Sequence, residues 1–448
     1  MKSIIIKFGG TSVSTKQNIK TICRIVAKEE KENPIVVVSA LSGVTDLLLS
    51  LTNSNGPRQQ EVLRKIKKIH MDLVKNYWGK TPQIIYKHIN KCIRELSDLL
   101  KGNTGEYSFR DKVISYGEIM SSYIIAAALK SSGIESKQVI ATSLIITNDD
   151  FGSAEFLPTL TKTKTKKELL PILKKGVVPV ITGFIGSTRN GQVATLGRGG
   201  SDYSAAIIGW ALDAREIQIW TDVDGVFSSD PRFIKDARIL REISYREASE
   251  LAAFGAKVLH PRTIRPVISV GIPVRVLNTS NPGASGTLIK SEPARKDHIL
   301  AIAAKRKITL VNLYSTDMLL NRGFLARIFI IFAKHNISID LVSVSEVSVS
   351  VSLDNDEHLQ KAVSELQKIA MITITRELGV VSLIGEGIVN VKNILKNIFS
   401  TLDSAGIDVK MISVGATDIN ISLVLATSKI DEAVYQLHGK MIRERKIS

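Results

Sequence analysis

Three short segments combine glycine with a cationic side chain, a pattern suited to holding phosphate or carboxylate groups. In the first, residues 4–12 (Ile-Ile-Ile-Lys-Phe-Gly-Gly-Thr-Ser), an apolar strand ends in Lys7 and is followed by Gly9 and Gly10. Glycine lets backbone N–H groups approach an anion closely, and a helix that follows adds its positive end. The lysine precedes the glycines, so this is not a Walker A loop. The segment predicts a phosphate cradle, and a plain strand–turn–helix is the alternative.

The second segment, residues 195–204 (Thr-Leu-Gly-Arg-Gly-Gly-Ser-Asp-Tyr-Ser), places Arg198 between glycines. A guanidinium group can grip a carboxylate with two hydrogen bonds, and glycines admit the backbone of a substrate. Ser201 and Asp202 open a predicted helix, where Asp202 can orient Lys7 or cap the helix. Simple helix capping would explain Ser201 but not the arginine.

Two further segments lie at a predicted strand end and at a predicted helix start. Residues 38–45 (Val-Ser-Ala-Leu-Ser-Gly-Val-Thr) offer small hydroxyl groups and backbone donors to a ligand, or form an ordinary turn. Glu118 is expected at the start of a helix, where it would either complement the helix dipole or bind an amino group.

A nucleotide would fit the strand end and turns of residues 220–232. Its base and ribose would rest on the backbone and on Phe227, with Arg232 on the phosphates. Asp222 and Asp224 could suggest a metal, but their spacing within an Asp-Gly turn favours a structural role.

The third cationic segment is residues 254–261 (Phe-Gly-Ala-Lys-Val-Leu-His-Pro). It supplies a further cation, Lys257. His260 precedes a proline and is expected to pack or cap rather than to catalyse.

Composition limits the function classes. The chain has 448 residues, 44% of them hydrophobic, and a formal charge of +17. The excess lysines are scattered, and the run at 162–167 has no interleaved aromatic residues, so we expect no nucleic-acid binding. Two cysteines, Cys23 and Cys92, form no metal or disulfide pattern, which favours a reducing cytoplasm. With no leader and no apolar stretch of about 18 residues, we expect no membrane span.

Alternating strands and helices in the first two-thirds predict a parallel sheet covered on both faces, with ligands beyond the carboxyl ends of the strands. The expected strands, besides the first, are 35–39, 138–144, 177–182 and 216–221, and the expected helices include 117–130 and 201–212.

From residue 308 the order becomes βαββαβ, which is ferredoxin-like. The first unit has strands 308–313, 337–342, 347–353 and 371–375 with helices 323–334 and 357–369. The second has strands 380–384, 408–413 and 420–425 with helices 391–404 and 430–441. It lacks a closing strand, which we expect residues 299–303 to supply. The linker is 291–297.

The motifs at 7–12, 197–202, 221–225 and 254–261 together resemble the signatures of aspartokinases, in the amino-acid kinase superfamily. The resemblance covers essentially the whole chain, including two units similar to ACT domains. It implies a three-layer α/β/α sandwich with a mainly parallel sheet, followed by two ferredoxin-like units. The implied domains are 1–290, 308–376, and 298–304 plus 379–448.

The resemblance also implies the reaction, in which ATP with Mg²⁺ phosphorylates the β-carboxylate of L-aspartate to 4-phospho-L-aspartate, the first step of lysine, threonine, methionine and diaminopimelate biosynthesis. It requires no tightly bound prosthetic group and no protein-held metal. Lys7 would neutralise the transferred group and Asp202 would fix it. The implied substrate-binding residues are Ala40, Thr45, Glu118, Arg198 and Ser201. The implied ATP-binding residues are Lys7, Gly9, Gly10, Thr221, Asp222, Phe227, Arg232, Lys257 and Val258. The family usually has tyrosine where Phe227 stands.

The C-terminal units resemble the effector region of lysine-sensitive aspartokinases, which implies inhibition by L-lysine and a homodimer or dimer of dimers through the ACT units. The implied effector residues are Met318, Asn321, Phe324, Leu325, Ser338, Ile339, Asp340, Ser345 and Glu346. A helix N-terminus with ordinary strand acids is the alternative. Another amino-acid kinase and an inactive ACT-type sensor are the competing functions.

Overall fold

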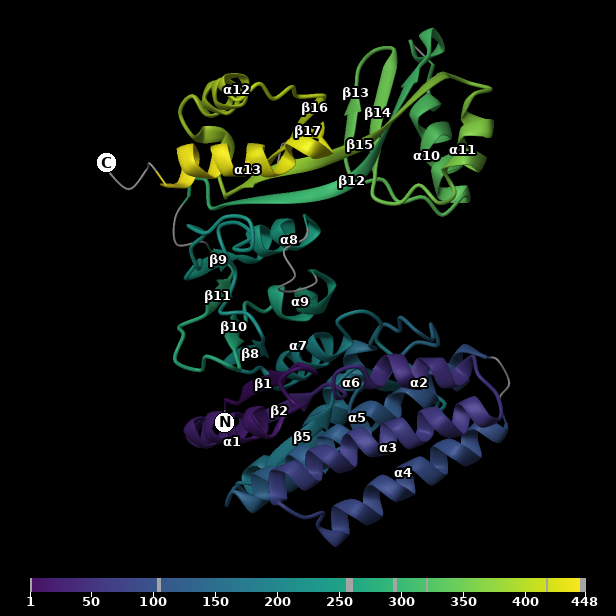
Figure 1. Cartoon of the computed structure of the whole chain (residues 1–448), viewed down its shortest axis with the longest axis vertical. Coiled ribbons are helices and arrows are strands. Elements are labelled where there is room, and N and C mark those ends of the chain that lie inside the picture. The colour runs from purple at the N-terminus through teal and green to yellow at the C-terminus, as the bar shows by residue number, and fades with distance from the viewer. Residues whose placement is uncertain are drawn as a thin grey trace. The chain divides into compact units, whose positions relative to one another are not determined.

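A computed structural model describes residues 2–102, 106–254, 261–292, 296–319, 321–415 and 418–443. The chain divides into two compact units, which are considered separately (Figure 1). Unit 1 comprises Met1–Val226, Arg241–Tyr245 and Val258–Glu292. Unit 2 comprises Phe227–Leu240, Arg246–Lys257 and Pro293–Ser448. Residues 227–240 and 246–257 therefore belong to unit 2, whereas we expected the first domain to run without interruption to residue 290.

The main sheet of unit 1 has eight strands in the order β3-β5-β2-β1-β8-β10-β11-β9. Their bounds are β1 Ile4–Phe8, β2 Pro34–Val38, β3 Ser136–Val139, β5 Val178–Thr182, β8 Glu216–Thr221, β9 Glu242–Ser244, β10 Val274–Asn278 and β11 Thr287–Lys290. Neighbouring strands run parallel except for β10 and β11. Strands β1 and β2 are buried along their whole length, as expected of a sheet covered on both faces. The mainly parallel α/β sheet is thus confirmed.

Helices surround this sheet, and a small sheet accompanies them in the order β4-β6-β7. The helices are α1 Lys16–Lys28, α2 Val44–Thr52, α3 Pro57–Trp78, α4 Gln83–Lys101, α5 Tyr107–Ser131, α6 Pro158–Lys174, α7 Gly200–Leu212 and α9 Pro261–Ile268. The small strands are β4 Ile146–Thr147, β6 Ile185–Thr188 and β7 Val193–Thr195. Helix α5 contacts α2, α4, β5 and β7 and is buried on most of its faces.

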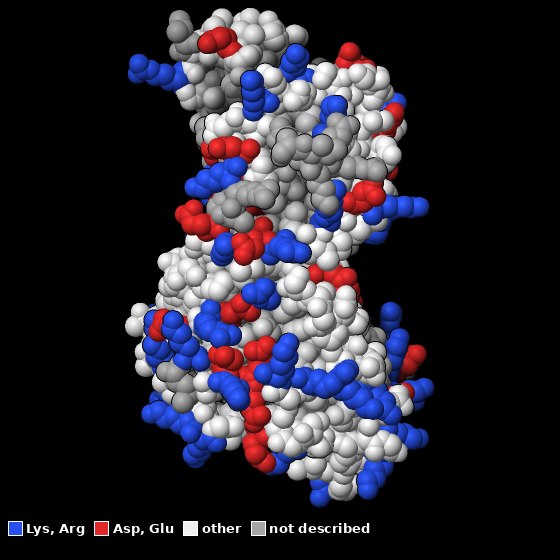
Figure 2. Space-filling view, turned by 90° about the vertical axis from the view of Figure 1, so that its left-hand side faces the viewer, with Lys and Arg blue, Asp and Glu red and all other residues white. Residues whose placement is uncertain are grey.

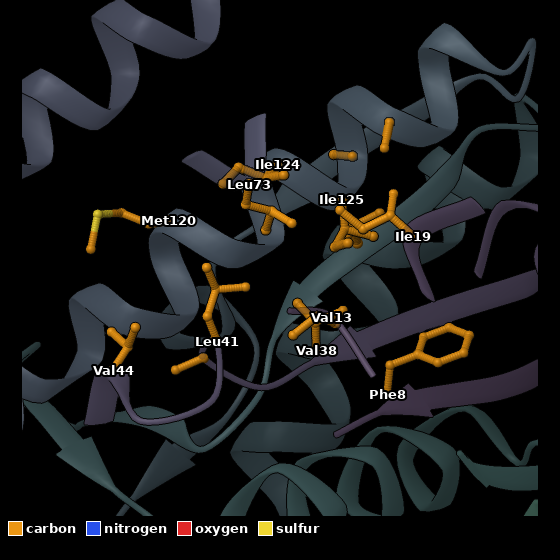
Figure 3. Packing of buried hydrophobic residues seen from close by; sticks show 14 of the residues in the cluster. Phe8, Val13, Ile19, Val38, Leu41, Val44, Leu73, Met120, Ile124 and Ile125 are labelled. Atoms are coloured by element: carbon orange, nitrogen blue, oxygen red, sulfur yellow. The ribbon is translucent and has the colours of Figure 1, made fainter. Parts of the chain in front are cut away.

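The core of unit 1 lies between the sheet and its helices. Figure 3 shows Phe8 and Val38 from the sheet, with Ile19 of α1, Leu73 of α3 and Ile125 of α5 in the same cluster. These side chains are almost fully removed from water, which is the main stabilising contribution to a fold of this kind. The core therefore holds β1, β2 and α5 in fixed positions.

The carboxyl ends of three strands meet at one edge of the sheet. In the strand register, Phe8 lies opposite Val38 of β2 and Trp220 of β8. The loops that follow β1, β2 and β8 therefore start side by side. Strand β1 has β2 on one side and β8 on the other, which is the arrangement that creates a ligand crevice in open α/β sheets.

Some predicted elements of unit 1 were wrong in extent. Helix α5 begins at Tyr107, ten residues before the expected start, and α1 begins only at Lys16 after the N-cap residue Thr15. The expected strand 138–144 ends at Val139, because the Ala141 N–H donates to the Thr182 hydroxyl at 2.8 Å instead of continuing the ladder.

Unit 2 contains a six-stranded antiparallel sheet in the order β13-β14-β12-β15-β17-β16. The strands are β12 Ala301–Tyr314, β13 Val342–Val344, β14 Ser348–Leu353, β15 Met371–Ile384, β16 Met411–Val414 and β17 Asn420–Ala426. Strands β12 and β15 have 14 residues each and run through both ferredoxin-like repeats. The segment expected to be a spare strand is the start of β12, where Ala301 lies opposite Ile384. The strand expected at 337–342 is instead the short, exposed β13.

Each repeat of unit 2 has its own hydrophobic core. The helices are α8 Tyr245–Ala253, α10 Phe324–Lys334, α11 Leu359–Leu366, α12 Ile394–Ser404 and α13 Ile430–His438. Helices α10 and α11 pack with β12 and β14 in the first repeat, and α12 and α13 pack with β15 and β17 in the second. Ile234, from the segment between β8 and β9, belongs to the core of the second repeat.

The surface carries charges of both signs. On the face drawn in Figure 2, lysine and arginine side chains are interspersed with aspartate and glutamate. Among the residues that the structure describes, no helix is both long and apolar enough to span a bilayer.

Candidate active site

Lys7 and Asp202 are brought together at the carboxyl edge of the main sheet. Lys7 is the fourth residue of β1, and Asp202 lies in the first turn of α7. The Lys7 Nζ and Asp202 Oδ1 atoms form an ion pair at 2.5 Å, and Lys7 is only 8% exposed. A charged pair in such a partly desolvated position has a fixed geometry, because both side chains are held by packed elements. The ammonium group therefore lies between the start of α7 and the glycine turn, where a Cβ atom on Gly9 would be 3.6 Å from Nζ.

The glycine turn after β1 packs closely against the loop after β2 at Gly10. The Gly9 N–H donates to the Trp220 carbonyl at 3.2 Å. A Cβ atom on Gly10 would lie 2.9 Å from the Ala40 carbonyl oxygen, closer than such contacts allow. The Ser14 hydroxyl donates to the Gly10 carbonyl at 2.5 Å and accepts from the Ser42 N–H at 2.8 Å. Ser14, which we did not expect, thus ties the two loops together.

Glu118 faces the loop after β2 from the middle of α5. The helix begins well before it, so the interpretation of Glu118 as a helix-start residue is wrong. Its Oε1 accepts from the Ala40 N–H at 3.0 Å, while its buried Oε2 has no hydrogen-bond partner among the described residues. Burial raises the pKa of Glu118 to about 8, although the Ala40 hydrogen bond opposes this change. A buried carboxyl group with one unpartnered oxygen is a suitable receptor for an ammonium group. Thr45 is half-buried in the first turn of the neighbouring α2.

Arg198 lies in a loop whose glycines adopt left-handed backbone conformations. Gly197 has φ of +79° and Gly199 has φ of +70°, values that residues with side chains rarely adopt. Arg198 is exposed, and no residue that the structure describes pairs with it. The N-cap position of α7 is held by Gly199, so the capping explanation of Ser201 is wrong. Ser201 is buried and close to Gly183, where a Cβ atom would lie 2.7 Å from its hydroxyl.

Asp111 is a second buried acid on α5, seven residues before Glu118, that the sequence reasoning missed. It is 0% exposed. Its Oδ2 accepts from the Gly152 N–H at 2.8 Å and from the Thr195 N–H at 2.7 Å. Spacing by seven residues puts both acids on one face of the helix, which is the signal that could have revealed it.

The end of β8 carries Thr221 and Asp222 in unit 1. The Thr221 hydroxyl donates to Asp222 Oδ1 at 3.1 Å. Asp224 accepts from the side-chain amides of Asn278 at 2.8 Å and Asn281 at 3.2 Å. Asp224 thereby stabilises the turn, which agrees with the structural interpretation of its spacing.

The other residues expected to bind ATP fall elsewhere. Phe227 and Arg232 belong to unit 2, where Phe227 is half-buried and forms an isolated bridge with Ile239. Arg232 is exposed and pairs with Asp230 at 2.6 Å, and this hydrogen-bonded pair lowers the pKa of Asp230. Lys257 and Val258 lie outside the described residues.

The expected effector residues all lie in the first repeat of unit 2. A cavity of about 660 Å³ opens before α10, lined by Thr316, Asp317, Leu319, Asn321 and Arg322. Of the nine expected residues, Asn321 lines it, while Met318 and Phe324 pack into the repeat's core and Leu325 is exposed on α10.

The remaining effector residues flank β13. Ser338, Ile339 and Asp340 precede the strand, and Ser345 and Glu346 follow it. Asp340 Oδ2 lies 3.8 Å from Lys305 Nζ. Burial, together with a hydrogen bond that the protonated Asp340 carboxyl group donates to Asp354, raises the pKa of Asp340 to about 6. The Ser345 hydroxyl hydrogen-bonds the Ser348 hydroxyl at 2.7 Å, and Glu346 is exposed.

Comparison with known proteins gives the class first. Residues 2–278 match the amino acid kinase family, and residues 381–441 match an ACT domain family. Aspartokinase 1, chloroplastic, of Arabidopsis thaliana is 37% identical over 99% of this chain and 81% of its own length. The crystal structure of E. coli aspartokinase III in complex with aspartate and ADP (R-state) has a TM-score of 0.85 at 34% identity, covering 98% of this chain and 100% of that one.

The same E. coli protein in complex with lysine and aspartate (T-state) has a TM-score of 0.84 at 34% identity, covering 99% of this chain and 100% of that one. The chain belongs to the aspartokinases. The predicted family, fold class and enzyme class, aspartate kinase, are confirmed.

Proposed function

We propose that this chain uses the complex of ATP with Mg²⁺ to phosphorylate the β-carboxylate of L-aspartate, producing 4-phospho-L-aspartate. The ion pair of Lys7 with Asp202 beside the glycine turn carries this proposal, because it aims a fixed cation at a turn built from close-packed backbone. The E. coli relative that holds aspartate and ADP supports both substrates. The pathway follows from this product, whose synthesis opens lysine, threonine and methionine biosynthesis.

The reaction needs charge neutralisation and alignment rather than a general base. The attacking carboxylate is already ionised at neutral pH, since its ordinary pKa is about 4. Lys7 and the Gly10 amide would offset the charge of the transferred phosphoryl group, and Asp202 keeps the Lys7 ammonium in place. The Gly9 N–H donates to the Trp220 carbonyl, so Gly9 would shape the turn rather than donate to the phosphoryl group. Arg198 with Ser201 would hold the carboxylate of aspartate, and the free Oε2 of Glu118 would accept its ammonium group.

The nucleotide would lie against Thr221 and Asp222, with Phe227, Arg232, Lys257 and Val258 as further contacts. This assignment rests on the motifs. Phe227 keeps the ring that the family's usual tyrosine would supply. Ala40 and Thr45 would border the aspartate pocket.

Formation of aspartyl phosphate, trapped with hydroxylamine, tests the activity. Lys7→Ala should lower turnover by at least about a thousandfold, and Arg198→Ala should raise the KM for aspartate by at least about tenfold. Arg189→Ala is the matched control, because Arg189 is an exposed arginine of the same unit outside the site. Near-normal kinetics in either site variant, with folding verified by circular dichroism, would contradict the assignments.

We further propose that lysine inhibits the enzyme by binding near the first repeat of unit 2. Asp340 and Glu346 would take the two amino groups of lysine, and the backbone at the start of α10 would take its carboxylate. Met318, Asn321, Ser338, Ile339 and Ser345 would complete the site. The E. coli relative in complex with lysine and aspartate supports this assignment.

The long strands offer a route from this site to the segment that carries Phe227. Strands β12 and β15 cross both repeats, and the Ile302 N–H in β12 donates to the Ser228 carbonyl at 2.8 Å. Ser228 also hydrogen-bonds His438 of α13 at 3.0 Å. A displacement of β12 on effector binding would therefore move the residue next to Phe227, which meets the need for two states that lysine binds differently.

Glu346→Ala should raise the lysine concentration for half-inhibition by about tenfold or more while sparing the rate without lysine. Glu357→Ala, which removes an exposed glutamate from the same repeat, is the control. Unchanged inhibition by lysine in Glu346→Ala would refute this effector site.

The assembly and location are also proposals. The exposed strand β13 leaves an edge that a second chain can pair with, so we expect a homodimer or a dimer of dimers through the ACT repeats. Light scattering with and without lysine would reveal it. The cytoplasmic location remains a prediction.

A further inference from the structure

We infer that Asp111 is a positioning residue that holds the Arg198 loop in place for aspartate. This inference rests on the proposed role of Arg198. Asp111 lies on α5, is fully buried, and receives hydrogen bonds from two backbone amides on one oxygen atom, Oδ2. Its other oxygen, Oδ1, is buried and has no hydrogen-bond partner among the described residues.

The two amides belong to the segments that fix the start of the Arg198 loop. Thr195 is the last residue of β7, directly before Leu196 and the loop. Its N–H donates to Asp111, and its carbonyl accepts from the Ala154 N–H at 2.9 Å. The Gly152 N–H also donates to Asp111, at 2.8 Å. One carboxylate oxygen therefore joins the end of β7 to the segment around Gly152.

The Arg198 loop rests on that same segment. A Cβ atom on Gly197 would lie 3.2 Å from the Gly152 carbonyl oxygen, so the two backbones are in close contact. The loop is closed on itself by the Gly200 N–H, which donates to the Gly197 carbonyl at 2.9 Å. Arg198 is exposed, and its side chain has no partner of its own among the described residues. Its position is therefore set by the backbone, and Asp111 anchors that backbone.

Helix α5 consequently reaches both ends of the proposed aspartate site. Glu118 presents its free Oε2 for the ammonium group, and Asp111 holds the loop that presents Arg198 to the carboxylate. A rigid, mostly buried helix sets the spacing between these two functions. The position of the Arg198 loop relative to Glu118 is then supported by one helix rather than by flexible loops alone.

Two variants of similar volume separate hydrogen bonding from packing. In Asp111→Asn the amide oxygen can take the place of Oδ2 and accept both N–H groups, whereas Asp111→Leu accepts neither. We expect Asp111→Leu to raise the KM for aspartate by about tenfold or more and to leave the KM for ATP within about twofold. Asp111→Asn should stay within about threefold of the unchanged protein for both substrates. If the leucine variant does not fold, Asp111→Ser replaces it, because serine is too short to reach both amides.

A double-mutant cycle with Arg198→Ala tests whether Asp111 affects aspartate binding through Arg198. If Asp111 acts through the loop, Asp111→Leu in the Arg198→Ala background raises the KM for aspartate no further. Equal effects in both backgrounds, or a lower kcat with both KM values unchanged, would overturn the inference in favour of a purely structural role. An unchanged KM in Arg198→Ala alone would overturn the aspartate-binding role of Arg198, and the inference with it. A raised KM in Arg198→Ala with a normal KM in Asp111→Leu would overturn the inference alone.

Discussion

Aspartate should bind more tightly as the pH rises from 6 to 8.5, because the Glu118 carboxyl group must lose its proton to receive an ammonium group. Burial raises the pKa of Glu118 from 4.5 to about 8. At pH 7 only about a tenth of the free enzyme then carries the ionised form, and each pH unit lower reduces that share about tenfold. The KM for aspartate should therefore be about ten times higher at pH 7 than its limiting value at high pH.

The same carboxyl group links pH to stability. Between pH 4.5 and about 8 the folded state holds a proton on Glu118 that the unfolded state has released. The free energy of unfolding therefore falls as the pH rises through this range, by up to about 4–5 kcal/mol in total. Glu118→Gln should remove this loss and should also make the KM for aspartate high and independent of pH.

Calorimetric titration with aspartate in buffers of different ionisation enthalpy measures the effect directly. At pH 7 we expect release of nearly one proton per aspartate bound, and none in Glu118→Gln. The KM for ATP serves as the internal control and should not follow the same pH profile. Aspartate binding without proton release at pH 7, or an identical pH profile in Glu118→Gln, would refute this reasoning.

Two other perturbations test the packing of unit 1. Gly10→Ala should lower kcat/KM for ATP by about tenfold or more and destabilise the fold by about 1–3 kcal/mol, because its Cβ would lie 2.9 Å from the Ala40 carbonyl. Steady-state kinetics and thermal unfolding measure this, and Gly283→Ala, with no atom within 4 Å of the added Cβ, should change neither. Burial lowers the pKa of His70 to about 4, so the free energy of unfolding should fall by up to about 3 kcal/mol as the pH drops from 6.5 to 4. Urea unfolding should show this loss in the unchanged protein and in His358→Gln, an exposed control, but not in His70→Gln; an equal acid sensitivity in His70→Gln would contradict it.

Strand-end logic made the central part of the site predictable. Lys7 stands near the end of an apolar strand before two glycines, and parallel strands deliver their carboxyl ends to one edge of the sheet. Arg198 instead follows β7, which pairs antiparallel with β6 in the small sheet, so its place depends on a different part of the fold. The sequence left two roles open for Asp202, orienting Lys7 or capping the helix, and the structure shows the ion pair with Lys7. The residue type of Glu118 was informative. Its position in the middle of α5 could not be predicted, because the start of this helix at Tyr107 has no strong capping signal.

Features that depend on hydrogen-bond partners remote in the chain could not be identified from the sequence. Asp111 accepts from the Thr195 amide 84 positions away. Its spacing of seven residues from Glu118 is the local signal for a shared helix face, but this spacing does not identify the amides that it binds. The continuity of β12 was also missed, because the polar residues Lys305, Arg306 and Lys307 resemble a linker. The strand continues there because its backbone pairs with β15 and Lys305 forms an ion pair with Asp354.

The shared strands of unit 2 impose an order on its folding during synthesis. The first part of β12, around Ile302, leaves the ribosome long before its partner Leu383 in β15 has been made. The first repeat can close once the start of β15 emerges, whereas the second must wait for β17, which pairs with the later part of β15. Until then, an apolar strand with an unsatisfied edge is exposed to neighbouring nascent chains. Helper proteins that shield such edges would be needed most during this interval.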